Sequence, residues 1–164
     1  MITCPASRLP GLYDITVFIK VNVPDNHGRT ALMYAISRVH VSLLEQWLFD
    51  CRIEVNHQDR QETTVLMLAP AIGTDSITHL LLNRADIDVN LQGNWGRTAL
   101  MLAAQFGRNE MVTALLSVSD IDETLQDNQG QSAFFFAQNL NHPQLVERLL
   151  QRPKISYTFS PRRN

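Results

Sequence analysis

The sequence predicts an all-α solenoid of stacked helix–turn–helix units, and three observations support this prediction. Residues of one kind recur every 34 positions, as Thr30, Thr64, Thr98 and Ser132 do. A fixed period of this size is typical of repeat architectures. Each unit opens with a polar turn, such as "GNWGRT", and continues into two short apolar segments with helical spacing. Neither segment can bury its apolar stripe alone, so neighbouring units must stack to form a core.

The register holds through four units without a gap. Small or apolar residues occupy the same place in each unit, and further sets follow the same step: Ala35, Ala69, Ala103 and Ala137; Leu48, Leu82, Leu116 and Leu150; Ile53, Ile87, Ile121 and Ile155. We therefore expect a single domain over residues 1–164. Its predicted parts are a degenerate half-repeat over 1–25 with a helix near 6–15, repeat one over 26–59, repeat two over 60–93, repeat three over 94–127, repeat four over 128–155, and a tail over 156–164.

The ends of the helices follow from residues with known preferences. The Thr or Ser after each turn can cap the first helix by accepting a bond from a free backbone N–H group. Gly73, Gly107 and Asn141 follow the first helices of three units and tolerate the left-handed conformation that ends a helix. Val39 stands at this position in repeat one, so we expect that helix to end differently. Pro70 falls inside the first helix of repeat two, where it predicts a bent or shortened helix or a deliberate break in the groove.

Residues Gly96 to Gly107 read G-x-T-A-L-M-x-A-A-x-x-G, and "DVN" stands at Asp88–Asn90. Over roughly residues 26–155 this pattern resembles the ankyrin repeat. The family often has a histidine where this chain has Met33, Met67, Met101 and Phe135, and these side chains can only pack. The resemblance implies an open array in which turns form fingers, first helices line a concave palm, and partner proteins meet both.

Composition and charge exclude several other classes. The formal net charge is −2, which is not the basic footprint of a nucleic-acid-binding protein. No apolar run approaches the ~18 residues of a membrane helix. Cys4 and Cys51 do not make a disulfide framework and are expected as inert thiols. Without a secretory signal, the expected location is intracellular, cytoplasmic or nuclear.

No catalytic, cofactor or metal site is predicted. "GNWGRT" lacks the lysine of a phosphate-binding loop, and its recurrence marks it as a turn. Histidines are scattered and the two cysteines stand apart, so zinc-ligand spacing is absent. The acid pairs Asp86/Asp88 and Asp120/Asp122 recur in equivalent loops and are interpreted as loop residues. An alternative, small-molecule binding or unusual catalysis in the groove, would use Tyr34, His27, His57 or Asp59.

The resemblance implies partner contacts at the turn positions around the glycine and at the exposed end of each first helix. The matching residues are Asn26, His27, Arg29, Ser37 and Arg38; Arg60, Gln61, Thr63, Ala71 and Ile72; Asn94, Trp95, Arg97, Gln105 and Phe106; and Asn128, Gln129, Gln131, Asn139 and Leu140. Repeat three places Trp95, Arg97 and Phe106 together, and aromatic and arginine side chains dominate interface hot spots. The alternative for Trp95 is that it folds back on a neighbouring turn as packing.

The expected function is a non-catalytic module that binds another protein. A scaffold segment of a larger intracellular protein remains an alternative. Solenoids need polar end caps to stay soluble, and the N-terminal half-repeat is a poor one. It therefore suggests a possible homo-oligomer or a partner at that end.

Overall fold

The computed structural model describes residues 21–151, in which the chain forms four consecutive pairs of helices and no strand. The first helices of the pairs are α2 (Ala31–Ser37), α4 (Val65–Ile72), α6 (Ala99–Gln105) and α8 (Ala133–Asn139). The second helices are α3 (Val41–Leu48), α5 (Asp75–Leu82), α7 (Asn109–Leu116) and α9 (Pro143–Leu150). Each pair falls inside one predicted repeat. The predicted helix near 6–15 and the tail lie outside the described residues.

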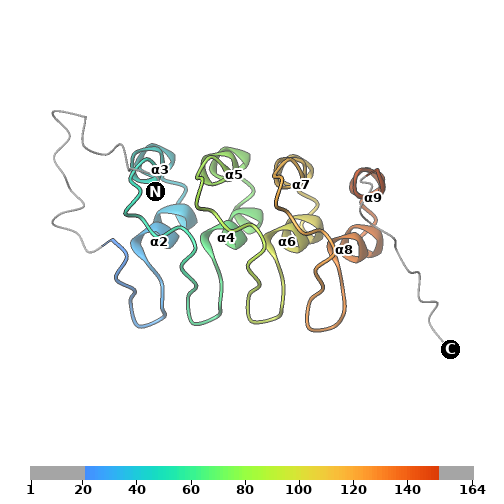
Figure 1. Cartoon of the computed structure of the whole chain (residues 1–164), viewed down its shortest axis with the longest axis horizontal. Helices are drawn as coiled ribbons and strands as arrows, with labels where there is room; N and C mark the ends of the chain where they lie inside the picture. The colour runs from blue at the N-terminus through green and yellow to red at the C-terminus, as the bar shows by residue number, and fades with distance from the viewer. Residues whose placement is uncertain (1–20, 152–164) are drawn as a thin grey trace.

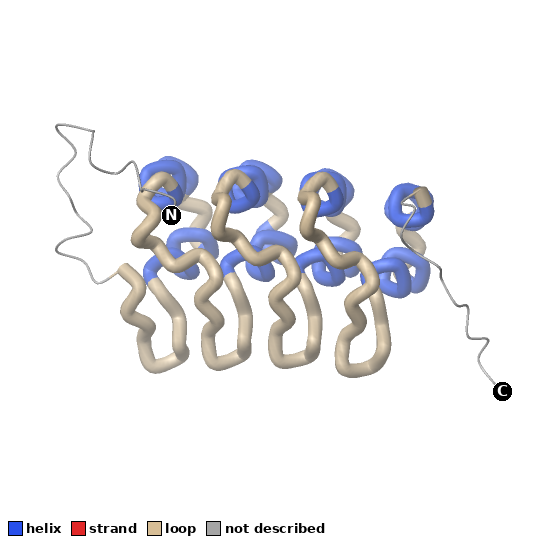
Figure 2. The backbone as a smooth tube through the Cα atoms, viewed as in Figure 1, coloured by secondary structure: helices blue, strands red, loops and turns tan. Residues whose placement is uncertain are grey.

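The pairs stack side by side into an all-α solenoid, as the period predicts (Figure 1). First helices form one row and second helices form another. The long turns between repeats project from the row of first helices as four fingers, drawn as tan loops in Figure 2. Each first helix contacts the first helix of the next repeat. Each second helix likewise contacts the second helix of the next repeat, from α3 to α9. This arrangement places equivalent residues of successive repeats in rows.

The core is continuous along the stack because each repeat lends its apolar face to the next. Met33, Met67 and Met101, at the family's histidine position, are all buried, whereas Phe135 is half-buried. Thioether side chains adapt to irregular gaps, so they fill this position by packing alone. Each fully buried side chain of this size contributes about 1.5–3 kcal/mol relative to an exposed one.

Backbone-to-side-chain bonds tie the repeats together outside the core. The amide of Asn56 donates to the carbonyl of Asp86 (2.6 Å) and accepts from the N–H of Asp88 (2.8 Å). Asn22 and Asn90 make the same pair of bonds at the neighbouring junctions. Gln58 similarly donates to the carbonyl of Gln92 (3.0 Å) across the second junction. These amides satisfy loop backbone groups that a helical stack leaves unpaired.

The predicted caps form in three of the four first helices. The hydroxyl oxygens of Thr64 and Thr98 accept from the N–H groups three residues on at 3.3 Å, and Ser132 does so at 3.5 Å. Thr30 occupies the equivalent position, but its buried hydroxyl bonds to no described residue. Repeat one therefore lacks a cap that its sequence predicts.

The expectation that the first helix of repeat one ends differently is wrong. Val39 has φ 58°, close to 77° at Gly73, 64° at Gly107 and 57° at Asn141. A β-branched residue is disfavoured in this region. Its N–H nevertheless donates to the carbonyl of Ile36, as Gly107 does to Ala104. Packing against the neighbouring repeats holds this turn in the left-handed conformation, although the conformation is strained for valine.

Pro70 does not shorten its helix, so the expectation of a shortened helix is wrong. Helix α4 has 8 residues, whereas α2, α6 and α8 have 7 each. The proline stands near the end, where it removes one bond and leaves the first turns intact. The guanidinium of Arg108 lies against Gly73 and donates to the Pro70 carbonyl at 3.0 Å. A cation at a helix C-terminus is favoured by the helix dipole, so the next repeat stabilises this end.

Cys51 is disulfide-bonded rather than an inert thiol, so that prediction is wrong too. The chain's other cysteine, Cys4, lies outside the described residues.

Candidate functional site

The predicted contact residues lie on two adjoining parts of the stack: the fingertips and one face of the first helices. Exposed at the fingertips are Asn26, His27, Arg29, Arg60, Gln61, Asn94, Trp95, Asn128 and Gln129. Exposed on the first helices or just after them are Ser37, Arg38, Ala71, Phe106, Asn139 and Leu140. Thr63, Ile72, Arg97, Gln105 and Gln131 are half-buried.

Trp95 projects from a finger whose backbone is fixed on both sides. The N–H of Asn94 donates to the carbonyl of Gln61 (3.2 Å), and the carbonyl of Trp95 accepts from the N–H of Asn128 (3.0 Å). The Trp95 side chain is nevertheless 71% exposed. The alternative in which this ring folds back as packing is therefore wrong. A rigid backbone here presents a large apolar side chain to solvent.

Arg97 is held by the fourth finger and the first helix of repeat four rather than extended into solvent. Its Nε lies 3.4 Å from Asp127 Oδ2, and its Nη1 donates to Gln105 Oε1 at 3.0 Å. Its guanidinium carbon is 4.8 Å from the centre of the Phe136 ring. The structure thus brings Arg97 and Gln105 together, as predicted, but adds Asp127 and Phe136, which sequence reasoning missed. The 34-residue recurrence of the turn acids was the available signal for Asp127.

Those turn acids shape three of the four fingers. Oδ1 of Asp25 accepts from two backbone N–H groups, of His27 and Arg29, and Oδ1 of Asp59 and of Asp127 does the same in its own turn. Such Asx bonds mimic a backbone turn. The third finger has Gly93 at this position, and the residue of the second finger that is equivalent to Arg29 and Arg97 is Thr63. Both the turn acid and the arginine that would pair with it are therefore missing between the second and third fingers.

Tyr34 is engaged in the first finger. Its O–H donates to Asp25 Oδ2 at 2.7 Å. That bond, with the N–H groups of Arg29 and His27, favours the charged carboxylate and lowers the pKa of Asp25 to about 2. The same contact raises the pKa of Tyr34 above its usual value. This pair positions the turn of repeat one beside the first helix.

The other groups named for the catalytic alternative also have structural partners. A ring nitrogen of His57, Nε2, lies 2.8 Å from the Gly28 carbonyl oxygen. Asp59 is buried, where it accepts from the amides of Gln61 and Thr63 and lies 3.5 Å from Arg29 Nε. His27 is exposed at a fingertip. These contacts account for His57 and Asp59 as parts of the turns.

One row of equivalent residues defines the exposed end of the first helices. It runs Arg38, Ile72, Phe106, Leu140, one residue from each repeat; the name apolar row is used below for its last three members. Phe106 is 47% exposed and Leu140 is 48% exposed. Successive first helices contact each other, so these three residues occupy equivalent positions in neighbouring repeats of the stack. The surface composed of this row and the adjoining rows that start at Tyr34 and Ser37 is called the palm.

Charge is distributed unequally between the palm side and the back of the stack. Arg38 and Arg60 are exposed and form no ion pair with any described residue. The second helices and connecting loops carry exposed acids at Glu45, Glu54, Asp75, Asp86, Asp88, Glu110, Asp120, Asp122 and Glu147. Hydrogen bonds from Arg84 lower the pKa of Asp86, so this carboxylate stays ionised in an ion pair whose positive partner balances its charge.

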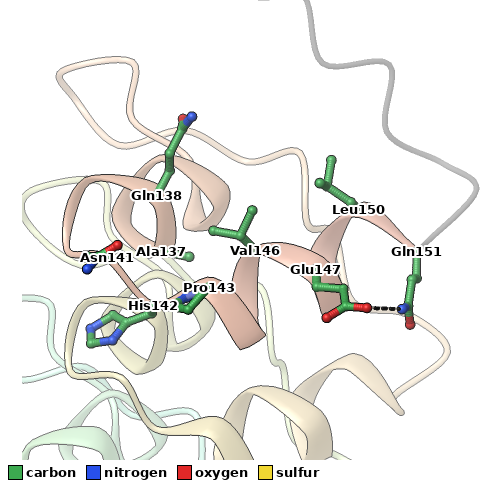
Figure 3. A pocket seen from close by; sticks show the side chains of 9 residues that line it. All are labelled: Ala137, Gln138, Asn141, His142, Pro143, Val146, Glu147, Leu150 and Gln151. Atoms are coloured by element: carbon green, nitrogen blue, oxygen red, sulfur yellow. Dashed lines mark hydrogen bonds between the residues drawn. The ribbon is translucent and has the colours of Figure 1, made fainter.

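A hollow of about 580 Å³ lies at the end of repeat four, between α8 and α9 (Figure 3). Its walls include the apolar residues Val146 and Leu150 and the polar residues Gln138, Asn141 and His142. No residue of the predicted contact set lines it. The hollow belongs to the C-terminal end of the described stack and is separate from the palm.

A family model of ankyrin repeats (3 copies) matches residues 11–92, 40–122 and 66–159. No curated protein matches the chain. Within residues 21–151, no helix has the length and apolar character needed to cross a membrane.

Proposed function

This chain belongs to the ankyrin-repeat family, whose members are generally protein–protein interaction modules, and we propose that it binds a partner protein through its palm and fingertips. Ankyrin-repeat domains are typically not enzymes. Residues central to the proposed contact are Trp95, Phe106 and Leu140. The proposed contact is surrounded by one apolar residue, Ile72, and by polar residues of the fingers: His27, Arg29, Arg60, Gln61, Asn94, Gln129 and Gln131.

The exposure of Trp95 beside the apolar row is the observation that carries the proposal. An indole that is 71% exposed leaves a large apolar area in water, and burying it under a partner recovers roughly 25 cal/mol per Å². The hydrogen bonds on both sides of Trp95 fix the finger before binding. Little backbone entropy is then lost on association, which favours a hot spot.

Arg97 and Gln105 have a different role in this proposal. Their mutual hydrogen bond and the contacts of Arg97 with repeat four hold the base of the third finger. They position Trp95 and Phe106 and contribute less direct contact area. Substituting either one acts on the partner through the shape of the finger.

The test is partner capture by proximity labelling in native cells, followed by affinity measurements on each captured protein with Trp95→Ala. We expect affinity to fall at least ~30-fold, since hot-spot truncation costs about 2 kcal/mol or more. Phe49→Ala is the matched control, because Phe49 is 83% exposed but ends the second helix α3. Unchanged affinity with Trp95→Ala, at unchanged stability, would remove Trp95 from the contact set.

A further inference from the structure

We infer that the palm takes a peptide segment of the partner that combines bulky apolar side chains with an acidic residue. This inference rests on the proposed function and specifies the chemistry of the partner. In the inferred complex the apolar side chains lie on the apolar row, and the acidic residue lies near Arg38 at the repeat-one end of that row, with Arg60 adding positive charge at the second fingertip.

The palm itself has a cationic end and an apolar end. The row that is apolar in repeats two to four begins with Arg38 in repeat one. The adjoining row, Ser37, Ala71, Gln105 and Asn139, is uncharged. An apolar ligand alone would leave the cationic end without a partner, whereas a segment with an acid at one end matches both.

The acids on the palm side leave the cations available. Asp25 is occupied by the O–H of Tyr34 and by two backbone amides. Asp59 and Asp127 are buried and lie against Arg29 and Arg97. Glu62 is exposed two residues from Arg60 at the second fingertip. Arg38 therefore has no competing acid in its own row.

The back of the stack strengthens this preference. Its exposed acids, including Asp75, Asp88 and Asp122, repel an acidic segment from the second helices and loops. Opposite charges at the palm and like charges at the back both direct the segment to one face. Electrostatic complementarity of this kind sets orientation and excludes other binding modes.

The geometry also sets the spacing within the segment. Packed helices lie roughly 8–10 Å apart, so Arg38 and Phe106, two repeats apart, are separated by about 20 Å. An extended chain covers about 3.3 Å per residue. The acidic residue is then about six residues from the side chain that contacts Phe106.

The experiment selects random 15-residue peptides by display on the whole chain, and measures the affinity of synthetic versions of the enriched peptides by fluorescence anisotropy. We expect the peptides to share an acid and a bulky apolar residue about six positions apart. Arg38→Glu or Arg60→Glu should weaken binding about tenfold, and Phe106→Ala at least as much. Arg148→Glu, which reverses an exposed arginine on α9, should change affinity less than about twofold. Changing the peptide's acid to lysine should restore binding to Arg38→Glu.

Two failures are distinguishable. Peptides that depend on Phe106 or Trp95 but bind equally well to Arg38→Glu and Arg60→Glu would overturn the acidic partner and leave the proposed function standing. If no selected peptide depends on any palm or fingertip residue, both the inference and the proposed function are wrong.

Discussion

Repeats one and three have similar backbone conformations at their turns and helix ends, but different side chains occupy these positions. Their fingers turn at Gly28 and Gly96 with φ 78° and 72°, and their first helices end in the left-handed region at Val39 and Gly107. In repeat three glycine adopts this conformation without strain, and Thr98 caps the helix. In repeat one valine is forced into it, and the hydroxyl of Thr30 bonds to none of the described residues. The period therefore determines the backbone, while individual side chains determine how stable each repeat is.

The same two repeats also differ in what they present to a partner. Repeat three exposes Trp95 and Phe106 where repeat one has His27 and Arg38. The repeat with the capped first helix and the left-handed glycine is thus the one with the larger exposed apolar side chains. A well-anchored finger can hold such side chains in solvent, because the backbone below them does not depend on their burial.

The largest predicted effect on stability comes from replacing Gly107 of repeat three by valine, the residue that repeat one has at this position. Gly107→Val should destabilise the protein by about 3 kcal/mol, measured as a shift in chemical unfolding. A non-glycine residue in the left-handed region costs roughly 1–2 kcal/mol, and a β-branched one costs more. A Cβ atom at Gly107 would also lie 2.6 Å from Cε1 of His142, so that ring would have to move.

The reciprocal substitution gives repeat one the glycine of repeat three. Val39→Gly should raise stability by about 1 kcal/mol, because the strain removed exceeds the entropy cost of glycine. Gly107→Asn should cost less than Gly107→Val, since Asn141 already adopts this conformation in repeat four. A stability loss with Val39→Gly would mean that valine is not strained there.

These outcomes also bear on what the sequence could predict. Spacing within one repeat predicted the helix pairs, the hydroxyl caps at Thr64, Thr98 and Ser132, and the left-handed ends at the glycines. The conformation of Val39 was not predictable from its own preference, because contacts along the stack override local propensity.

For the same reason, the geometry of the candidate contact residues could be predicted only in part. Exposure of Trp95 and Phe106 was expected from their place in the repeat. The contacts of Arg97 with Asp127 and Phe136 join two repeats and appear in no single-repeat pattern.

Removing the turn arginine of repeat one or of repeat three, Arg29 or Arg97, should have an effect on stability of intermediate size. Arg97→Ala should cost about 1.5 kcal/mol of stability, because it removes a bond to Gln105, an ion pair and a cation–π contact. Arg29→Ala should cost about 0.5 kcal/mol or less, since its contact with Asp59 is 3.5 Å and its side chain is 46% exposed. Chemical unfolding of both variants provides the measurement. Equal losses would show that the contacts with Gln105 and Phe136 add nothing to the ion pair.

The smallest predicted effect is a pH dependence of stability that the first finger has and the third finger lacks, because Gly93 replaces the acid there. The pKa of Asp25 is about 2 in the folded chain against an ordinary value of 3.8. A lowered folded pKa stabilises the protein fully above the unfolded value and loses that effect as pH falls toward 2. Asp25→Asn should therefore be less stable than the parent chain near pH 6, and the difference should narrow between about pH 4 and pH 2.

Unfolding midpoints at these pH values, and NMR titration of the Asp25 carboxyl group, measure this effect. Tyr34→Phe removes the strongest donor to Asp25, so the pKa of Asp25 should rise toward its ordinary value while the carboxylate remains. Arg29 and His27 still donate their backbone N–H groups in that variant, which keeps part of the shift. A stability difference between the parent chain and Asp25→Asn that stays constant or widens on acidification would contradict the assignment. It would mean that the first finger, like the third with Gly93 at this position, holds its turn without help from a carboxylate there.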